Sequence, residues 1–331
     1  MRFVLYGRSA IPVWLTAYHK PALANLSNNG LLPKSIREDV ALSFLKEKLP
    51  QVPPPYQLSA AEWRGGPKLG IEVRTTQRAL PEHSFHCLDH GLFIPSPELC
   101  LLEVARTASM PELIMLGSAL CGAFVIDPSR KSGLGQRKPF ATKESIGAFV
   151  EACAGHRGVE NLRRATAFLK EGAASPPEVF LNMALTLPGR LGGFGLTRCV
   201  ANKAIKLSKR AASIAERSTV VPDLLWDEAR VAVEYDSNSE HLSPAQVTRD
   251  AKKRMALEAD GYTVITVTTS QLAQIKPMED VASEIARRAG TRRRTRSVNY
   301  RNRQAELFST SRTLSDWINL DWAREKREGR G

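Results

Sequence analysis

Hydrophobic and polar residues alternate differently in three successive parts of the chain. Short apolar runs with strand-like spacing occur at residues 2–6, 69–74 and 92–95, separated by proline-rich breaks. From Ser96 the apolar spacing becomes helical, and Ser96-Pro97 has the residue types of an N-cap followed by a first helical position. We therefore expect a small mixed α/β region over residues 1–95 and a helical region over residues 96–172. Further helices are predicted over residues 111–119, 143–153 and 159–170.

The third part begins after the small-residue break at 172–174. The pattern predicts a helix from Ser175 to about Leu187, a glycine-rich turn at 189–195, a strand near 197–207, a hairpin with strands 220–226 and 230–236, a helix over 243–259 and a strand over 262–268. Gly261 has the position of a helix C-terminal residue. The order helix, strand, hairpin, helix, strand predicts an α/β domain over residues 173–285, with a mixed central sheet flanked by helices.

Length and composition are those of a globular protein with two domains: 331 residues, of which 43% are hydrophobic. No apolar run approaches the roughly 18 residues needed to span a bilayer, and residues 10–18 lack the flanks of a signal peptide. The five cysteines are scattered and odd in number, which favours reduced thiols over a disulfide framework. These features predict a cytoplasmic protein without a membrane partner.

Positive charge is concentrated near the C-terminus. The formal net charge is +13, and residues 287–303 hold eight arginines and no acidic residue. The densest part of this tract consists of Arg292, Arg293, Arg294 and Arg296. Such a tract either binds nucleic-acid phosphates through counterion release or forms a solvated tail. We expect a basic, partly disordered tail over residues 286–331, whose removal weakens DNA binding and leaves the folded core intact.

Two carboxylates are brought together by the predicted hairpin. With a turn of three or four residues, Asp223 lies opposite Glu234 or one position away from it, and Asp236 lies on the same face as Glu234. Like charges this close favour a bound cation, and carboxylate oxygens suit Mg²⁺ or Mn²⁺. The alternative is an acidic edge that faces solvent, but the apolar residues flanking both strands favour burial on at least one side.

The helix over 243–259 contains a second unusual pair. Asp250 and Arg254 fall within the apolar arc of Val247, Ala251 and Met255 on a helical wheel. We expect an ion pair directed towards the core that has a positioning role. The alternative is an ordinary i,i+4 pair on the surface.

Over about residues 174–275 the sequence resembles the very-short-patch-repair-endonuclease-like branch of the PD-(D/E)xK restriction-endonuclease superfamily. The resemblance is carried by Ser175-x-x-Glu178, Pro222-Asp223-Leu224, Val233-Glu234-Tyr235-Asp236, His241, Asp250-x-x-x-Arg254 and Gly261-Tyr262-x-Val264. In that branch the module is commonly attached to N-terminal regions like the antitoxins of abortive-infection toxin–antitoxin systems, and residues 96–105 loosely resemble a segment of those regions. The resemblance therefore implies a toxin–antitoxin or defence-system partner.

The resemblance implies that Asp223 and Glu234 bind the metal and that Glu178 is the acid of the first helix. Glu178 has an alternative role as the capping-box acid. Asp236 stands where many relatives have lysine, so water activation is left to the metal or to a neighbour such as His241, which is otherwise a loop histidine.

One further cluster contains soft ligands, namely His83, His86, Cys87 and His90. Structural zinc sites usually draw on two separated ligand pairs, so we favour unrelated side chains over a zinc site.

These observations favour a Mg²⁺-dependent DNA endonuclease of defence or repair. A nonenzymatic DNA-binding regulator that keeps the nuclease fold as a scaffold, and a protein-interaction module, are the alternatives. Metal-dependent cleavage would indicate the endonuclease, and DNA binding without cleavage would indicate the regulator. Absence of nucleic-acid affinity would indicate the interaction module.

Overall fold

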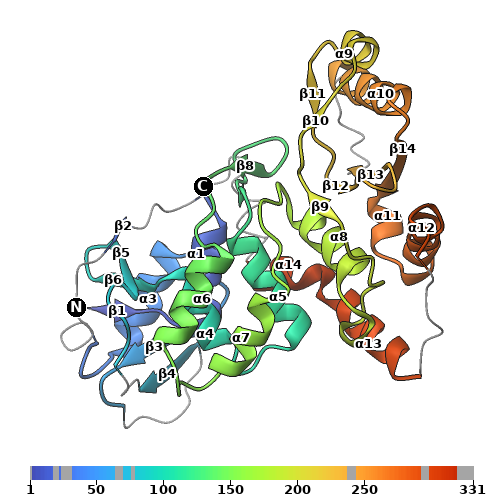
Figure 1. Cartoon of the computed structure of the whole chain (residues 1–331). Helices are drawn as coiled ribbons and strands as arrows, with labels where there is room; N and C mark the ends of the chain where they lie inside the picture. The colour runs from blue at the N-terminus through green and yellow to red at the C-terminus, as the bar shows by residue number, and fades with distance from the viewer. Residues whose placement is uncertain are drawn as a thin grey trace. The chain divides into compact units, whose positions relative to one another are not determined.

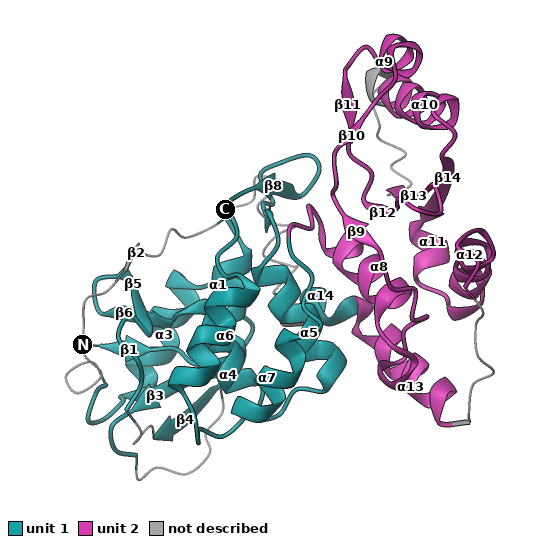
Figure 2. Ribbon diagram, viewed as in Figure 1, with its two compact units in different colours: residues 1–171, 312–331 teal, residues 172–311 magenta. Residues whose placement is uncertain are grey.

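The computed structural model describes residues 2–17, 22–23, 32–63, 70–75, 79–236, 244–291 and 298–318. The chain forms two compact units, unit 1 with residues 1–171 and 312–331 and unit 2 with residues 172–311 (Figure 2). The predicted boundary near residue 172 agrees with this division. The predicted regions 1–95 and 96–172 belong to one unit instead of two.

Unit 1 is mixed α/β (Figure 1). Its strands are β1 (Phe3–Val4), β2 (Ala22–Leu23), β3 (Tyr56–Ala60), β4 (Ile71–Thr75), β5 (Phe85–Asp89), β6 (Leu92–Pro95), β7 (Phe124–Ile126) and β8 (Leu134–Gln136). Its helices are η1 (Gly7–Ser9), α1 (Ile11–Leu15), α3 (Glu38–Lys48), α4 (Pro97–Val104), α5 (Met110–Leu120), α6 (Lys143–Ala152), α7 (Val159–Thr166) and α14 (Thr313–Trp317). The largest sheet has the order β1-β6-β5-β2, and β3-β4 and β7-β8 form separate pairs.

A buried carboxylate links three segments of unit 1. Glu103 of α4 accepts a hydrogen bond from the Gly7 amide at 2.7 Å and forms an ion pair with Arg74 of β4. The Arg74 guanidinium lies over the Tyr6 ring, 4.1 Å from its centroid. Because a buried charge is costly without partners, this network fixes the N-terminal segment, β4 and α4 to one another.

Unit 2 contains the predicted nuclease-like region. Its elements are α8 (Pro176–Thr186), η2 (Gly189–Leu191), β9 (Val200–Ala201), β10 (Ile205–Lys206), α9 (Lys209–Ala215), β11 (Thr219–Val220), β12 (Leu224–Trp226), β13 (Val231–Asp236), α10 (Pro244–Ala259), β14 (Thr263–Thr268), α11 (Thr269–Leu272), α12 (Ile275–Arg288) and α13 (Val298–Ser309), followed by η3 (Thr310–Arg312) at the unit boundary. The main sheet has the order β14-β13-β12-β9 and is mixed, since β13 pairs antiparallel with β12 and parallel with β14.

The central strand β13 is covered on both faces. Ala232 joins a core with α9 and α10, while Val231 and Val233 on the opposite face are also fully buried. Helix α8 contacts β13. This burial explains the apolar run in β13 and leaves only its C-terminal half accessible.

Two predicted strands are each divided in the structure. The expected strand 197–207 is split into β9 and β10 by Asn202, which has a φ of +51°. The expected strand 220–226 is split into β11 and β12 around Pro222, which has no amide hydrogen for a ladder bond. Asp223 therefore lies directly after a break, immediately before β12.

The predicted basic tail is wrong over residues 298–318, which form helices. Phe308 of α13 is buried and packs edge-on against Phe180 of α8, with ring centroids 5.3 Å apart. The Tyr300 hydroxyl donates to the Gly193 carbonyl at 3.4 Å. Because α13 contributes to the core of unit 2, the removal of residues 287–331 would also remove part of that core.

Candidate active site in unit 2

Asp223 is held against the hairpin partner strand. The β12–β13 register pairs Leu224 with Val233, and its continuation by one residue places Asp223 beside Glu234. The Tyr235 amide donates a hydrogen bond to Asp223 Oδ2 at 2.7 Å. The Asp223 carbonyl accepts from the Asn202 amide at 3.1 Å. The predicted juxtaposition of Asp223 and Glu234 on neighbouring antiparallel segments is therefore confirmed.

Glu234 is paired with Lys253 of α10. The Lys253 Nζ lies 2.7 Å from both carboxylate oxygens and donates a hydrogen bond to Oε2. Oε1 is buried and accepts no hydrogen bond. Both side chains are mostly buried, with 20% of Glu234 and 22% of Lys253 exposed. The Lys253 ammonium is thus the partner of the whole Glu234 carboxylate.

Glu178 caps α8 and also lies near Asp223. Its Oε2 accepts from the Ala174 amide and its Oε1 accepts from the Ser175 hydroxyl, each at 2.8 Å. The Ser175 hydroxyl accepts from the Glu178 amide at 3.4 Å. The negative charge of Asp223 contributes to the pKa of Glu178, so the two carboxylates are within electrostatic range. Ser175 is confirmed as the N-cap, but Glu178 does not complete the predicted capping box, because its carboxylate accepts from the Ala174 amide and not from the Ser175 amide. The same side chain lies near the acidic group.

Burial raises the pKa of all three carboxyl groups. For Glu178, burial is the largest cause and the charge of Asp223 adds to it. For Asp223, burial outweighs the Tyr235 amide and the Lys253 ammonium, which both lower its pKa. For Glu234, burial raises the pKa to about 7 although Lys253 lies beside it. Lys253 lowers the pKa of each acid, so it is the cation shared by the three.

Lys253 was not among the predicted site residues. On a helical wheel of α10 it falls on the charged face with Arg249 and Lys252. In the structure, Ala256 and Leu257 of α10 are fully buried, and Lys253 precedes them by three and four residues. Residues at these spacings share one helix face. The spacing of Lys253 from Leu257 is therefore the sequence signal that places Lys253 on the side of α10 that faces the sheet.

The expected core-directed ion pair of Asp250 and Arg254 is wrong. Both side chains are exposed, and Arg254 donates instead to the Thr266 hydroxyl of β14. Val247 and Met255, which were expected to face the core, are 54% and 56% exposed. The apolar arc of α10 is directed largely towards a pocket.

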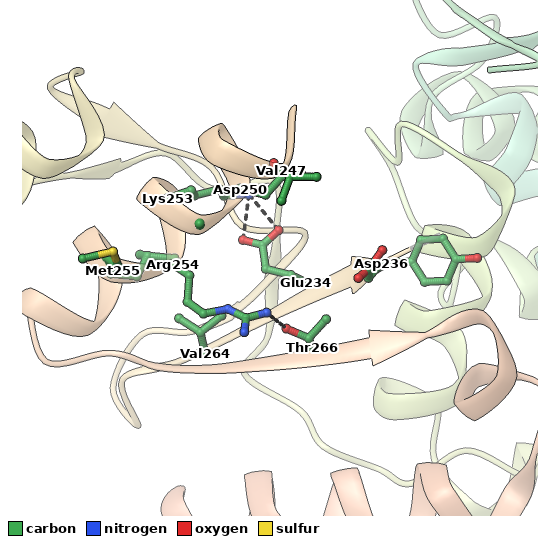
Figure 3. Close-up of a pocket in the computed structure, with 12 residues that line it drawn as sticks. Glu234, Asp236, Val247, Asp250, Lys253, Arg254, Met255, Val264 and Thr266 are labelled. Atoms are coloured by element: carbon green, nitrogen blue, oxygen red, sulfur yellow. Dashed lines mark hydrogen bonds and ion pairs between the residues drawn. The ribbon is translucent and has the colours of Figure 1, made fainter. Parts of the chain in front are cut away.

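That pocket has a volume of about 530 Å³ and lies between α10 and the strands β13 and β14 (Figure 3). Its lining includes Glu234 and Lys253, the half-exposed Asp236, and the exposed side chains of Asp250 and Arg254. The structure thus places Asp236 beside the acidic group, at the C-terminal end of β13. His241 and Arg292, Arg293, Arg294 and Arg296 lie outside the described residues, so their roles stay predictions.

No three acidic, histidine or cysteine side chains of the described residues are close enough to form a ready-made metal site. In the predicted cluster of soft ligands, His86 lies on β5 and packs edge-on against Trp14, with ring centroids 4.9 Å apart. The Cys87 thiol donates to the Asp89 carbonyl at 3.4 Å. These two side chains therefore have structural partners within unit 1.

No family model, curated protein or solved structure matches the chain. Over the part of the chain that is described, no helix combines the length and apolar character needed to cross a membrane.

Proposed function

We propose that unit 2 is a metal-dependent nuclease domain of the PD-(D/E)xK type that hydrolyses phosphodiester bonds in DNA. The observation that carries the proposal is the placement of Asp223 beside Glu234 in the hairpin, with the Lys253 ammonium of α10 2.7 Å from the Glu234 carboxylate. Glu178 lies in the first turn of α8, within electrostatic range of Asp223. The expected helix, strand, hairpin, helix, strand correspond to α8, β9, β12–β13, α10 and β14, which supports the proposal, although β10, α9 and β11 are inserted between β9 and β12.

The donor set of the acidic group is of the kind that Mg²⁺ or Mn²⁺ prefers, because it consists of buried carboxylate oxygens. In the structure the Glu234 carboxylate is neutralised by Lys253. Asp223 and Glu234 would hold the ion, which would polarise the phosphodiester and lower the pKa of a bound water. This assignment follows the resemblance residue by residue.

The protein side chains have separate tasks in this mechanism. The Tyr235 amide fixes the orientation of Asp223, and the Lys253 ammonium is placed to offset negative charge that develops on the phosphate. Lys253 supplies from α10 the cation that many relatives carry at the position of Asp236. In hydrolysis, a water oxygen bonds to phosphorus while the bond from phosphorus to the leaving sugar oxygen breaks, and that oxygen receives a proton.

The test is metal-dependent cleavage of supercoiled, linear, nicked and mismatched DNA. Asp223→Asn and Glu234→Gln should each abolish cleavage and weaken metal binding in calorimetry, since both remove ligand charge with little change in volume. Glu228→Gln is the matched control, because Glu228 is exposed and pairs only with Arg198 among the ion pairs of the described residues. Cleavage that survives both site substitutions, or no cleavage and no metal binding by the wild type, would contradict the proposal.

A second candidate is a nonenzymatic DNA-binding regulator. It is favoured by the Lys253–Glu234 ion pair, which offsets the charge of one acid without a metal. In that case the wild type binds DNA without cleaving it, and Glu234→Gln leaves the affinity unchanged.

A further inference from the structure

The pocket beside the acidic group combines apolar and charged surfaces. Val247 and Met255 are two of the four exposed large hydrophobic residues among those described, and both line it. Ala251 lies between them on α10 and Val264 contributes from β14. A side of a helix with this much exposed apolar surface is more typical of a binding site than of a solvated face.

Polar groups are placed around these apolar surfaces. Arg254 extends from α10 to Thr266 on β14, and this hydrogen bond restrains its guanidinium (Figure 3). Asp250 adds an exposed carboxylate from the same helix. The pocket therefore offers a hydrogen-bond acceptor and a restrained donor next to apolar walls, which suits a flat molecule with polar edges.

The pocket is continuous with the acidic group, because Glu234 and Lys253 line it. A hydrocarbon chain would leave five charged side chains without solvent, and a metal ion alone would not use Val247 or Met255. A nucleobase has two apolar faces and an edge of donors and acceptors, and it is linked to the phosphate that the neighbouring residues would bind. The volume of about 530 Å³ is within the usual range for small-molecule sites, roughly 300–1,000 Å³.

We propose that this pocket binds one nucleobase of the nucleic-acid substrate, turned out of the base stack beside the phosphodiester that is cleaved. The inference rests on the proposed function and adds to it a base-binding subsite. Met255 and Val247 contact the faces of the base, and Asp250 and Arg254 contact its edge. Extrusion of a base into a protein pocket is known from enzymes that act on the base itself.

The experiment measures the binding of the four 2′-deoxynucleoside 5′-monophosphates and of 2-deoxyribose 5-phosphate to the full chain by calorimetry, without metal. At least one nucleotide should bind ten times more tightly than the sugar phosphate. Ala251→Trp fills the pocket from an exposed helical position and should reduce nucleotide binding at least tenfold. Thr248→Trp is the matched control, since Thr248 is an exposed residue of α10 outside the lining, and it should change binding less than twofold.

Thermal unfolding monitors whether both tryptophan variants are folded, and Met255→Ala provides a milder change to the same wall. The inference is overturned if the sugar phosphate and the nucleotides bind equally well. It is also overturned if neither Ala251→Trp nor Met255→Ala changes nucleotide binding. Both results hold even if the protein cleaves DNA. Base-dependent binding lost in Ala251→Trp supports the pocket even if no cleavage is found. The failure of the pocket and the failure of the nuclease proposal are thus separate results.

Discussion

At the scale of single residues, Lys253 connects the acidic group to α10. Its ammonium contacts Glu234 at 2.7 Å and lowers the pKa of Glu178 and Asp223 as well. Its neighbour Lys252 pairs instead with Glu216, the residue that follows α9. The two adjacent lysines of α10 thus have different environments. A comparison of their substitutions separates a role in the site from a nonspecific effect of positive charge.

Lys253→Met should reduce metal-dependent cleavage by about 10²–10³-fold, because it removes a preorganised positive charge while keeping a similar aliphatic stem. Lys252→Met should have little effect on cleavage, since Lys252 pairs with Glu216 and not with the acidic group. Single-turnover cleavage rates check both variants. Equal rates for Lys253→Met and wild type would assign Lys253 a structural role only.

The pKa of Glu234 gives a prediction for the metal-free protein. Burial raises this pKa from an ordinary 4.5 to about 7, so the folded state holds a proton that the unfolded state releases between these values. The contribution of Glu234 to the free energy of unfolding should therefore be fully present below pH 4.5. It should be lost as the pH rises to about 7. The raised pKa corresponds to at most about 3 kcal/mol.

Urea unfolding in EDTA at pH 5 and pH 8 checks this expectation. Wild type should lose more stability between the two pH values than Glu234→Gln, which cannot ionise there. Glu258→Gln, an exposed position on α10, should follow wild type. Identical losses in wild type and Glu234→Gln would contradict the raised pKa of Glu234.

At the scale of elements, the glycine-rich turn after α8 allows α13 to pack closely. Gly192 has a φ of +84°, and a Cβ there would lie 2.2 Å from the Arg303 carbonyl oxygen of α13. Gly195 has a similar φ of +73° but no atom within 4 Å of such a Cβ. The two glycines share a left-handed conformation and differ in the space around them.

Gly195→Ala should lower the free energy of unfolding by about 1 kcal/mol, as expected from the left-handed conformation alone. Gly192→Ala should lower it by a further 1–3 kcal/mol or so, because its methyl group collides with backbone and displaces α13. Chemical denaturation of both variants measures the difference. If the two variants are equally stable, the close packing of α13 on the turn is not important for stability.

At the scale of the whole molecule, the net charge of +13 favours a polyanionic partner. The arginine tract can be tested without removing α13, whose core residues are Tyr300, Gln304, Leu307 and Phe308. Replacement of Arg292, Arg293, Arg294 and Arg296 by serine should weaken DNA binding and reduce the slope of log affinity against log salt. Each lost phosphate contact should lower this slope by about 0.9.

Fluorescence anisotropy over a salt series gives the slope. The control replaces Arg163 and Arg164 of α7 by serine, which removes positive charge from unit 1 instead. An unchanged slope in the four-serine variant would assign the tract to solvation alone.

The sequence by itself determined the features that depend on neighbouring residues. The period-2 and helical patterns predicted α8, the β12–β13 hairpin, α10 and β14, whereas α9, α11, α12 and α13 were not predicted. Ser175 marked the start of α8. Hairpin pairing placed Asp223 beside Glu234, because only ten residues separate them and strand register fixes their relative position. Pro222 and Asn202 carried the signals for the two strand breaks, although the apolar runs around them favoured continuous strands.

Tertiary structure decided what depends on packing between distant segments. The rotation of α10 about its axis is set by its packing on α9 and the sheet, and this rotation directs Lys253 to Glu234 and leaves Val247 and Met255 at the pocket. Glu178 and Asp223 are 45 residues apart in the sequence. They approach each other because α8 packs beside β13. The packing of α13 on the Gly192 turn joins segments more than 100 residues apart, and a helical wheel contains no information about which neighbour covers which face.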